Sequence, residues 1–300
     1  AIVAGIISHI QQGDALALDH RGTPPMIMRG VDPTLILREL LGQPGGLCGG
    51  QGGHMHLFSK EHLVASSGIV GASGPAAAGF GLAAQYLRPG AIAVAFFGEG
   101  AINQGMLMES MNLASAWNLP VLFVCKDDTW SITTSSDEVT GGNLNERARG
   151  LGLPAVESDG LDASAVWDVT EAAVRRARSG RGPTFLRFHC MHREGHFLGF
   201  QLIRAVQHPL KEMPGIAVQL VRSFFHPGGS ALGERLAGLK AVLGAVFATM
   251  RDPRRDPGND PITRARAALR LNPSRLAELE GRIANEIESI LAASLTEVPG

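Results

Sequence analysis

Continuous apolar runs alternate with amphipathic segments along the first two-thirds of the chain. An apolar run with branched side chains predicts a strand that is buried on both faces, and apolar residues at helical spacing predict a helix that covers it. The strands expected are residues 91–97, 120–125, 155–157 and 183–190, and the helices expected are residues 104–117, 145–150 and 162–179. Strands that alternate with helices indicate an α/β fold, with a mostly parallel sheet and helices on both faces.

The pattern changes after residue 200, so we expect three regions: an α/β domain over 1–200, a helical insertion and linker over 201–259, and a helical tail over 260–300. Within the insertion, apolar side chains recur on one helical face, namely Leu232, Leu236, Leu239, Leu243, Val246 and Met250. Residues 251–261 are rich in proline and charge, which is typical of a linker. Residues 274–291 predict a second amphipathic helix.

Acidic residues follow two of the predicted strands. Glu99 lies in a Gly-acid-Gly turn after residues 91–97, and Asp127 and Asp128 follow residues 120–125. Parallel strands end at one edge of the sheet, where ligands of open α/β sheets bind. Glycine lets the backbone approach a phosphate, and carboxylates hold a divalent cation that the phosphate also binds. The residues therefore predict a site for a metal and a phosphorylated cofactor.

Composition narrows the class of protein. The chain has 300 residues, of which 45% are hydrophobic and 18% charged, and a net charge of −1, so no nucleic-acid partner is implied. No apolar stretch is long enough to span a membrane, so no membrane partner is expected either. The three cysteines show no paired spacing and suit a reducing compartment, which suggests the cytoplasm. Because the chain starts at an alanine, an N-terminal truncation is expected, and the mitochondrial matrix stays open.

The segment GEGAINQGMLMESMNLASAWNLPVLFVCKDD resembles the thiamine-diphosphate fingerprint of the alpha subunits of 2-oxo acid dehydrogenases, the pyruvate, branched-chain and acetoin enzymes. Further segments that resemble the family occur in the same order as in its members. They include the segment at His20 and Arg21, residues 52–56 and residues 68–71. Residues 195–197 are most similar to acetoin-type members. The resemblance implies the thiamine-diphosphate-binding fold, with thiamine diphosphate and Mg²⁺ as cofactors.

The resemblance also implies the metal ligands: the side chains of Glu99 and Asp128 and the backbone carbonyl of Trp130. The family has Asp and Asn at the first two positions, so a longer side chain and an added charge alter the magnesium site. Magnesium demands near-ideal octahedral geometry at about 2.0–2.1 Å, which makes both changes significant.

Other residues are assigned to the cofactor by the same resemblance. Arg21 would pair with the diphosphate, as a planar bidentate donor suits. His196 would contact the diphosphate from a loop and assist acyl transfer as a catalytic residue, and His56 would line the approach as a second catalytic candidate. The remaining expected cofactor contacts are His20, Gly68, Ile69, Val70, Gly100 and Ala101. The family has an arginine where this chain has His192, and an acid where this chain has Phe200. The loop that carries His196 therefore differs from the loop of the family.

The function implied is that of an enzyme subunit. It would decarboxylate a 2-oxo acid, or cleave acetoin, and pass the acyl unit to the lipoyl domain of an acyltransferase component. Its partner would be a beta subunit in an α2β2 heterotetramer.

Two other functions stay open. A non-catalytic alpha-like scaffold would have lost metal and cofactor binding, as the changes at Glu99, Asp128, His192 and Phe200 suggest. A nicotinamide-dependent dehydrogenase is weakly indicated by the Gly-x-Gly turn, but Asn103 stands where the third glycine of that motif belongs.

Overall fold

The computed structural model describes residues 1–132, 134–192, 196, 211, 214, 218, 221–222, 224–226, 228–250, 256–270 and 272–295. Within these residues, seven strands form one sheet in the order β2-β3-β1-β4-β5-β9-β8. The strand β2 runs antiparallel to β3, and the other neighbouring pairs are parallel. The predicted α/β class with a mostly parallel sheet is confirmed.

The strands in the middle of the sheet are those with the longest apolar runs. From β4 the side chains of residues 93–97 are at most 1% exposed, and residues 121–125 of β5 are fully buried. Such runs form parallel strands because helices cover both faces of the sheet. The strands span Ala15–Leu18 (β1), Phe58–Ser59 (β2), Val64–Ser66 (β3), Ala93–Gly98 (β4), Val121–Asp127 (β5), Ala155–Asp159 (β8) and Thr184–His189 (β9), with a small hairpin of Trp130–Ser131 (β6) and Thr134–Ser135 (β7).

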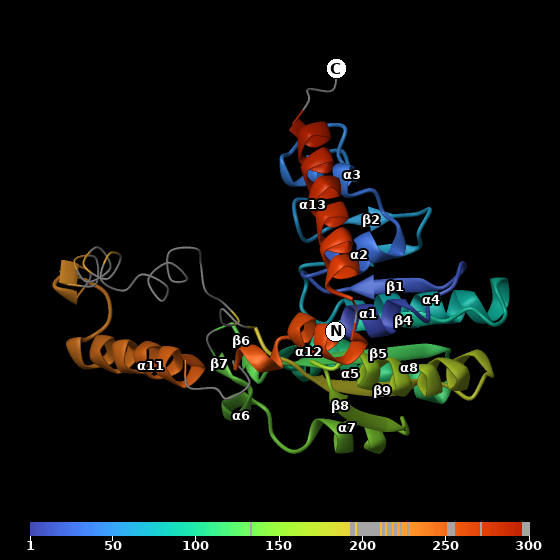
Figure 1. Ribbon diagram of the computed structural model, residues 1–300. Helices are drawn as coiled ribbons and strands as arrows, with labels where there is room; N and C mark the ends of the chain where they lie inside the picture. The colour runs from blue at the N-terminus through green and yellow to red at the C-terminus, as the bar shows by residue number, and fades with distance from the viewer. Residues whose placement is uncertain are drawn as a thin grey trace.

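Helices lie on both faces of this sheet (Figure 1). The helices α4 (Ser73–Leu87), α5 (Gly105–Ala116) and α7 (Leu144–Gly150) share one buried cluster with the sheet. On the other face, α1 (Ile2–Ile7) and α8 (Ala163–Arg178) pack in a second cluster. The strands and helices predicted within residues 91–190 are thus present, with ends that differ by a few residues. The other elements are α2 (Thr23–Arg29), α3 (Pro33–Leu40), η1 (Glu99–Asn103), α6 (Ser136–Val139), α11 (Leu232–Met250), η3 (Pro257–Asn259), α12 (Pro261–Leu269) and α13 (Pro273–Leu295).

The two helices expected near the C-terminus are present. The helix α13 is longer than predicted and packs along α3, where Arg38 donates a 2.9 Å hydrogen bond to the carbonyl of Ala293. The helix α11 projects away from the sheet in Figure 1. Most of residues 201–227 and the charged stretch 251–255 lie outside the described residues, so the three-region division stays a prediction.

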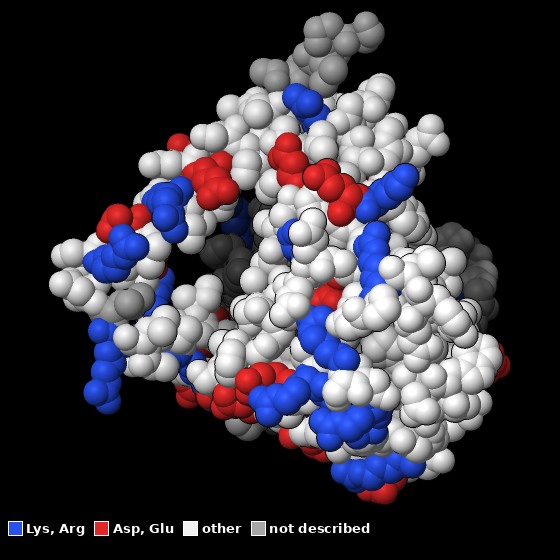
Figure 2. All heavy atoms as spheres, turned by 90° about the vertical axis from the view of Figure 1, so that its right-hand side faces the viewer, with Lys and Arg blue, Asp and Glu red and all other residues white. Residues whose placement is uncertain are grey.

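The side of the molecule that faces the amino ends of the strands shows no concentration of one charge. Figure 2 shows Lys and Arg interspersed there with Asp and Glu among uncharged residues. No helix among the described residues is long and apolar enough to cross a membrane. Cys125 is buried and its thiol pKa lies well above the usual value, while burial raises the pKa of Cys190 to about 12, so both thiols are unreactive at neutral pH.

Candidate functional site

The predicted site residues gather at one edge of the sheet because five parallel strands end there. Residues 19–21 follow β1, residues 67–70 follow β3, Glu99 follows β4, Asp128 follows β5, and residues 190–192 and 196 follow β9. In an open parallel sheet this edge is the usual place for a ligand. The sequence prediction that the acidic turns meet at this edge is therefore confirmed.

A tight turn fixes the carboxylate of Asp128. Thr129, the next residue, has a φ of 66°, which a β-branched residue rarely adopts. The turn aims the backbone N–H of Asp128 at Glu99 Oε2 (3.3 Å) and that of Trp130 at Asp128 Oδ1 (3.4 Å). Glu99 and Asp128 are only 1% and 5% exposed, so neither is a solvated surface acid.

Glu99 is a buried carboxyl group beside other acids. Its Oε1 accepts a 2.6 Å hydrogen bond from the hydroxyl of Ser136. Burial raises the pKa of Glu99 to about 7; the Ser136 hydrogen bond opposes this shift, and the charges of Asp128 and Asp127 add to it. Glu99 is therefore partly protonated at neutral pH, and a bound cation would favour its ionised form.

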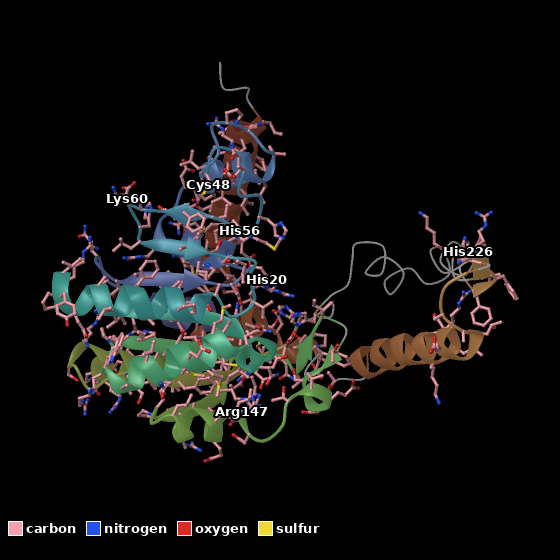
Figure 3. The ribbon with its side chains drawn as sticks, turned by 180° about the vertical axis from the view of Figure 1, so that it is seen from behind. His20, Cys48, His56, Lys60, Arg147 and His226 are labelled. Carbon is pink, nitrogen blue, oxygen red and sulfur yellow. The ribbon has the colours of Figure 1, made fainter. Side chains whose placement is uncertain are left out.

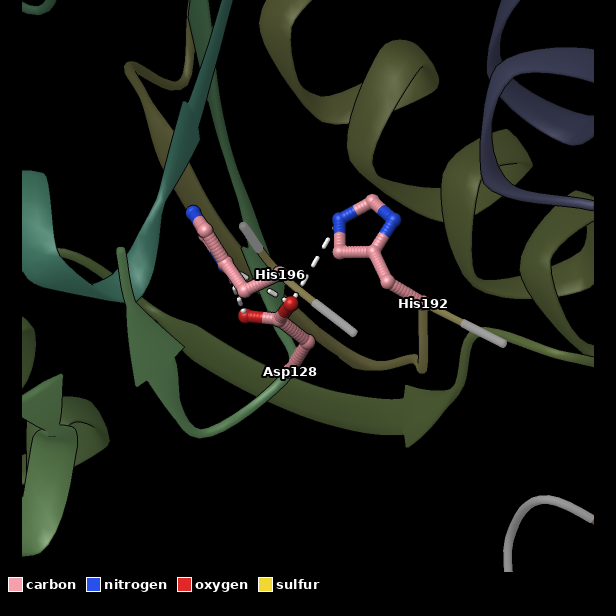
Figure 4. Close-up of side chains that lie close together, drawn as sticks. All are labelled: Asp128, His192 and His196. Carbon is pink, nitrogen blue, oxygen red and sulfur yellow. Dashed lines mark hydrogen bonds and ion pairs between the residues drawn. The ribbon is translucent and has the colours of Figure 1, made fainter. Parts of the chain in front are cut away.

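Asp128 is held by two imidazoles (Figure 4). The Nδ1 of His196 lies 2.8 Å from Asp128 Oδ2, and the Nε2 of His192 lies 3.4 Å from the same oxygen. Burial opposes ionisation of Asp128, but the hydrogen bond from His196 and the charges of both histidines hold its pKa below the usual value. Burial lowers the pKa of His192 to about 4, and the charge of Arg21 adds to that shift.

Arg21 joins β1 to the same cluster. Its Nη1 lies 2.6 Å from His192 Nε2, and its Nη2 donates a 2.8 Å hydrogen bond to the carbonyl of His196. His20 stands beside it and accepts from Arg21 Nε at 3.3 Å. Arg21, Asp128, His192 and His196 are thus brought together, although they come from segments far apart in sequence.

Two ion pairs brace this edge. Arg187 on β9 binds Asp127 Oδ2 through Nε at 2.7 Å, and Lys126 binds Asp19 at 2.8 Å. Asp127 also accepts a 3.0 Å hydrogen bond from the backbone of Thr129. These contacts make Asp127 a positioning residue for the turn that carries Asp128.

The other predicted residues line the surroundings of the cluster. Ile69 and Val70 are 60% and 55% exposed, so they are open to a ligand. His56 is exposed and lies near Gly68, and Figure 3 shows His56 and His20 near the same ends of the strands. A side chain at Gly100 would meet Ser131 Oγ at 2.2 Å, so glycine is required where η1 passes β6; Ala101 follows it in η1 and is buried.

Some residues of the site were not predicted, and others lie outside the described residues. The sequence does not identify Ser136 as a partner of Glu99, because nothing in its Ser/Thr-rich segment relates the two residues. It marks His192 as a departure from the family but gives no sign that His192 contacts Asp128. Gly195, Phe197 and Phe200 lie outside the described residues.

The donor set fits a divalent cation and a diphosphate. Glu99 and Asp128 present buried oxygen atoms, the ligand type that Mg²⁺ prefers, and the charge of Asp128 raises the pKa of Glu99 as two anions without a cation should. Arg21 supplies guanidinium donors suited to a diphosphate. Since Asp128 and Arg21 are bonded to the two histidines, cofactor binding would have to replace some of these contacts.

Several known proteins are similar to the part of the chain that carries this edge of the sheet. The profile of the family described as "Dehydrogenase E1 component" matches residues 1–199. The alpha subunit of acetoin:2,6-dichlorophenolindophenol oxidoreductase from Cupriavidus necator is 41% identical over 197 residues, which cover 65% of this chain and 59% of that protein. Its counterpart in Bacillus subtilis is 36% identical over 201 residues (66% and 60%). The alpha subunit of the pyruvate dehydrogenase E1 component from Zymomonas mobilis is 36% identical over 199 residues (65% and 56%). The matches thus span less than two-thirds of these relatives.

Proposed function

Since the chain belongs to the dehydrogenase E1 component family, we propose that it is the alpha subunit of a thiamine-diphosphate-dependent dehydrogenase. It would decarboxylate a 2-oxo acid, or cleave acetoin, and pass the acyl unit to a lipoyl group. The observation that carries the proposal is the buried pair Glu99 and Asp128 beside Arg21 at the carboxyl edge of the sheet. Similarity to acetoin and pyruvate enzymes over residues 1–199 supports it.

In this proposal the groups of the site are either metal ligands or cofactor contacts. The side chains of Glu99 and Asp128 and the carbonyl of Trp130 would hold Mg²⁺, and Arg21 would hold the diphosphate together with His196. His20, Gly68, Ile69, Val70, Gly100 and Ala101 would complete the cofactor contacts. Thiamine diphosphate, when bound, supplies the carbanion stabilisation that side chains cannot.

His196 is suited to move a proton. Because the Asp128 carboxylate accepts from Nδ1, that nitrogen carries the hydrogen, and the opposite nitrogen Nε2 keeps its lone pair in the neutral ring. Figure 4 shows the second nitrogen of His196 turned away from Asp128. Asp128 and the Arg21 contact to the His196 carbonyl would hold this histidine in place. The exposed His56 would line the approach to the active site as a second catalytic residue.

The assembly follows from the family. A beta subunit would complete the active site in an α2β2 heterotetramer, and the lipoyl domain of an acyltransferase would accept the acyl unit. The described residues contain no disulfide, which fits a cytoplasmic place.

A second candidate function is a non-catalytic alpha-like scaffold. It is favoured by the engagement of Asp128 with two histidines and by a Glu99 carboxyl that is half protonated near neutral pH. A scaffold would keep the fold and the beta interface without binding the cofactor.

An activity screen separates the two functions. The chain, co-expressed with its beta subunit, is assayed with acetoin and a series of 2-oxo acids, with reduction of 2,6-dichlorophenolindophenol as the readout. We expect turnover with one of these substrates, and a loss of at least tenfold in Arg21→Gln but none in the control Arg181→Gln, which lies exposed on the surface. A well-folded assembly without turnover on any substrate would favour the scaffold.

A further inference from the structure

The cluster of Asp128, His192 and His196 has the donor set of a transition-metal site. Two imidazole nitrogens and one carboxylate oxygen, one from each residue, lie within 4.8 Å of one another. Magnesium is bound by oxygen ligands, whereas imidazole suits zinc, cobalt, copper and nickel. The set therefore differs in chemistry from the all-oxygen set of Glu99, Asp128 and the Trp130 carbonyl.

The spacing of the ligand atoms supports this assignment. Two ligands at 2.0–2.1 Å from a tetrahedral zinc ion lie roughly 3.3 Å apart. In the cluster, Asp128 Oδ2 lies 2.8 Å from His196 Nδ1 and 3.4 Å from His192 Nε2. Shifts of a few tenths of an ångström would give both pairs that separation. The two imidazole nitrogens, which lie within 4.8 Å of each other, would also have to move to that separation.

The carboxylate is also positioned for a metal. Asp128 is 5% exposed, and the backbone N–H of Trp130 contacts its Oδ1, so Oδ2 is the oxygen that faces both imidazoles. The ring planes of the two histidines are nearly perpendicular, at 84°, with centroids 5.5 Å apart, so the two rings approach Asp128 from different directions. Three protein ligands leave a fourth position for water, as in many zinc sites with an exchangeable ligand.

We propose that Asp128, His192 and His196 bind a divalent transition-metal ion of the zinc class when the cofactor is absent. Arg21 Nη1 lies 2.6 Å from His192 Nε2, so its half-buried guanidinium must swing aside as the ion enters. The hydrogen that His196 Nδ1 donates to Asp128 must move to Nε2, so that the Nδ1 lone pair is free for the ion. The ion takes the Asp128 carboxylate, so it excludes Mg²⁺ from that oxygen. The inference does not depend on the proposed function, because a scaffold subunit would carry the same three ligands.

Cobalt titration without cofactor tests the site directly. Co²⁺ in a tetrahedral site with nitrogen ligands absorbs in the visible range, and Zn²⁺ removes the absorption by displacement. We expect one Co²⁺ per chain with such a spectrum, and a loss of affinity of at least tenfold in His192→Ala and in Asp128→Asn. The matched control is His9→Ala, whose ring contacts the Trp167 carbonyl and which is not one of the three ligands, so this variant should leave the spectrum unchanged.

Melting temperatures with and without Zn²⁺ distinguish a variant that has lost the metal site from one that fails to fold. Zn²⁺ should raise the melting temperature of the unaltered protein and of His9→Ala, because an ion that binds only the folded state stabilises it. Zn²⁺ should not raise the melting temperature of His192→Ala. The circular dichroism spectrum of this variant must match that of the unaltered protein. Absence of the cobalt spectrum from the unaltered protein, or its persistence in folded His192→Ala, would overturn the proposal. Binding of thiamine diphosphate with Mg²⁺ is measured separately, so its failure leaves this result intact.

Discussion

At the scale of residues, the sequence located the acids of the site but not their partners. Glu99 and Asp128 could be placed together because each follows an apolar strand, and parallel strands end at one edge. Ser136 and His196 lie 37 and 68 positions from the carboxylates they contact, so only tertiary structure relates them. The burial that raises the pKa of Glu99 likewise depends on packing, which no local pattern contains.

Glu99 should make stability fall as pH rises. Its folded pKa of about 7 exceeds the value of 4.5 expected when unfolded, so the folded state holds the proton more tightly. The free energy of unfolding should therefore decline from about pH 5 to pH 7 and level off above, by up to about 3 kcal/mol from this group. Glu99→Gln, which cannot ionise, should remove this decline.

Urea unfolding at pH 5, 6, 7 and 8 measures the effect. Glu109→Gln is the matched control, because Glu109 is exposed on α5 and should keep the decline of the unaltered protein. Parallel pH profiles for Glu99→Gln and the unaltered protein would show that Glu99 ionises normally in the folded state.

At the scale of elements, the strands that the sequence predicted are those buried on both faces. Residues 91–97 and 120–125 are apolar without interruption, so their burial was encoded locally. The helix α8 was predicted from its spacing and from its basic last turn, and Asp162 caps it by accepting from the backbone of Ser164 and Ala165. What could not be predicted is how these elements are tied together.

Arg178 is one such tie, between the end of α8 and the segment before β1. It binds both oxygens of fully buried Asp14, at 2.9 and 2.7 Å. Arg178→Ala should lower the free energy of unfolding by about 3–5 kcal/mol, because a buried carboxylate loses its partner. Arg175→Ala is the control: Arg175 forms an exposed pair with Glu171, and its loss should cost about 0.5 kcal/mol or less. Equal losses in chemical denaturation would refute the role of Arg178.

Glu39 is a second tie, at the end of α3. Its buried carboxylate accepts hydrogen bonds from the backbone N–H groups of Cys48, Gly50 and Gly52. This contact shapes the glycine-rich loop that leads to His56. Glu39→Gln replaces one acceptor oxygen by a donor and should cost about 2–3 kcal/mol of stability.

Limited proteolysis should then cut the loop over residues 42–53 faster in Glu39→Gln than in Glu61→Gln, whose side chain is exposed. Equal cleavage rates in the two variants would mean that the loop is held by other contacts.

At the scale of the whole molecule, family membership rests on residues 1–199, and the proposed function rests on the site that this portion carries. The sequence predicted the α/β class and the edge that carries the site, since both follow from the order of apolar runs. The insertion expected over 201–259 shows no such pattern outside its helix, so the sequence predicts its boundaries but not its role. The central claim is that Glu99, Asp128 and Arg21 still form a cofactor site.

Calorimetric titration of thiamine diphosphate into the co-expressed alpha–beta assembly, with and without Mg²⁺, tests that claim most directly. We expect micromolar binding of thiamine diphosphate that requires Mg²⁺ and that is lost in Asp128→Ala. A well-folded assembly that binds no thiamine diphosphate at millimolar Mg²⁺ would contradict it, and would leave the protein as a scaffold that keeps the fold without the chemistry.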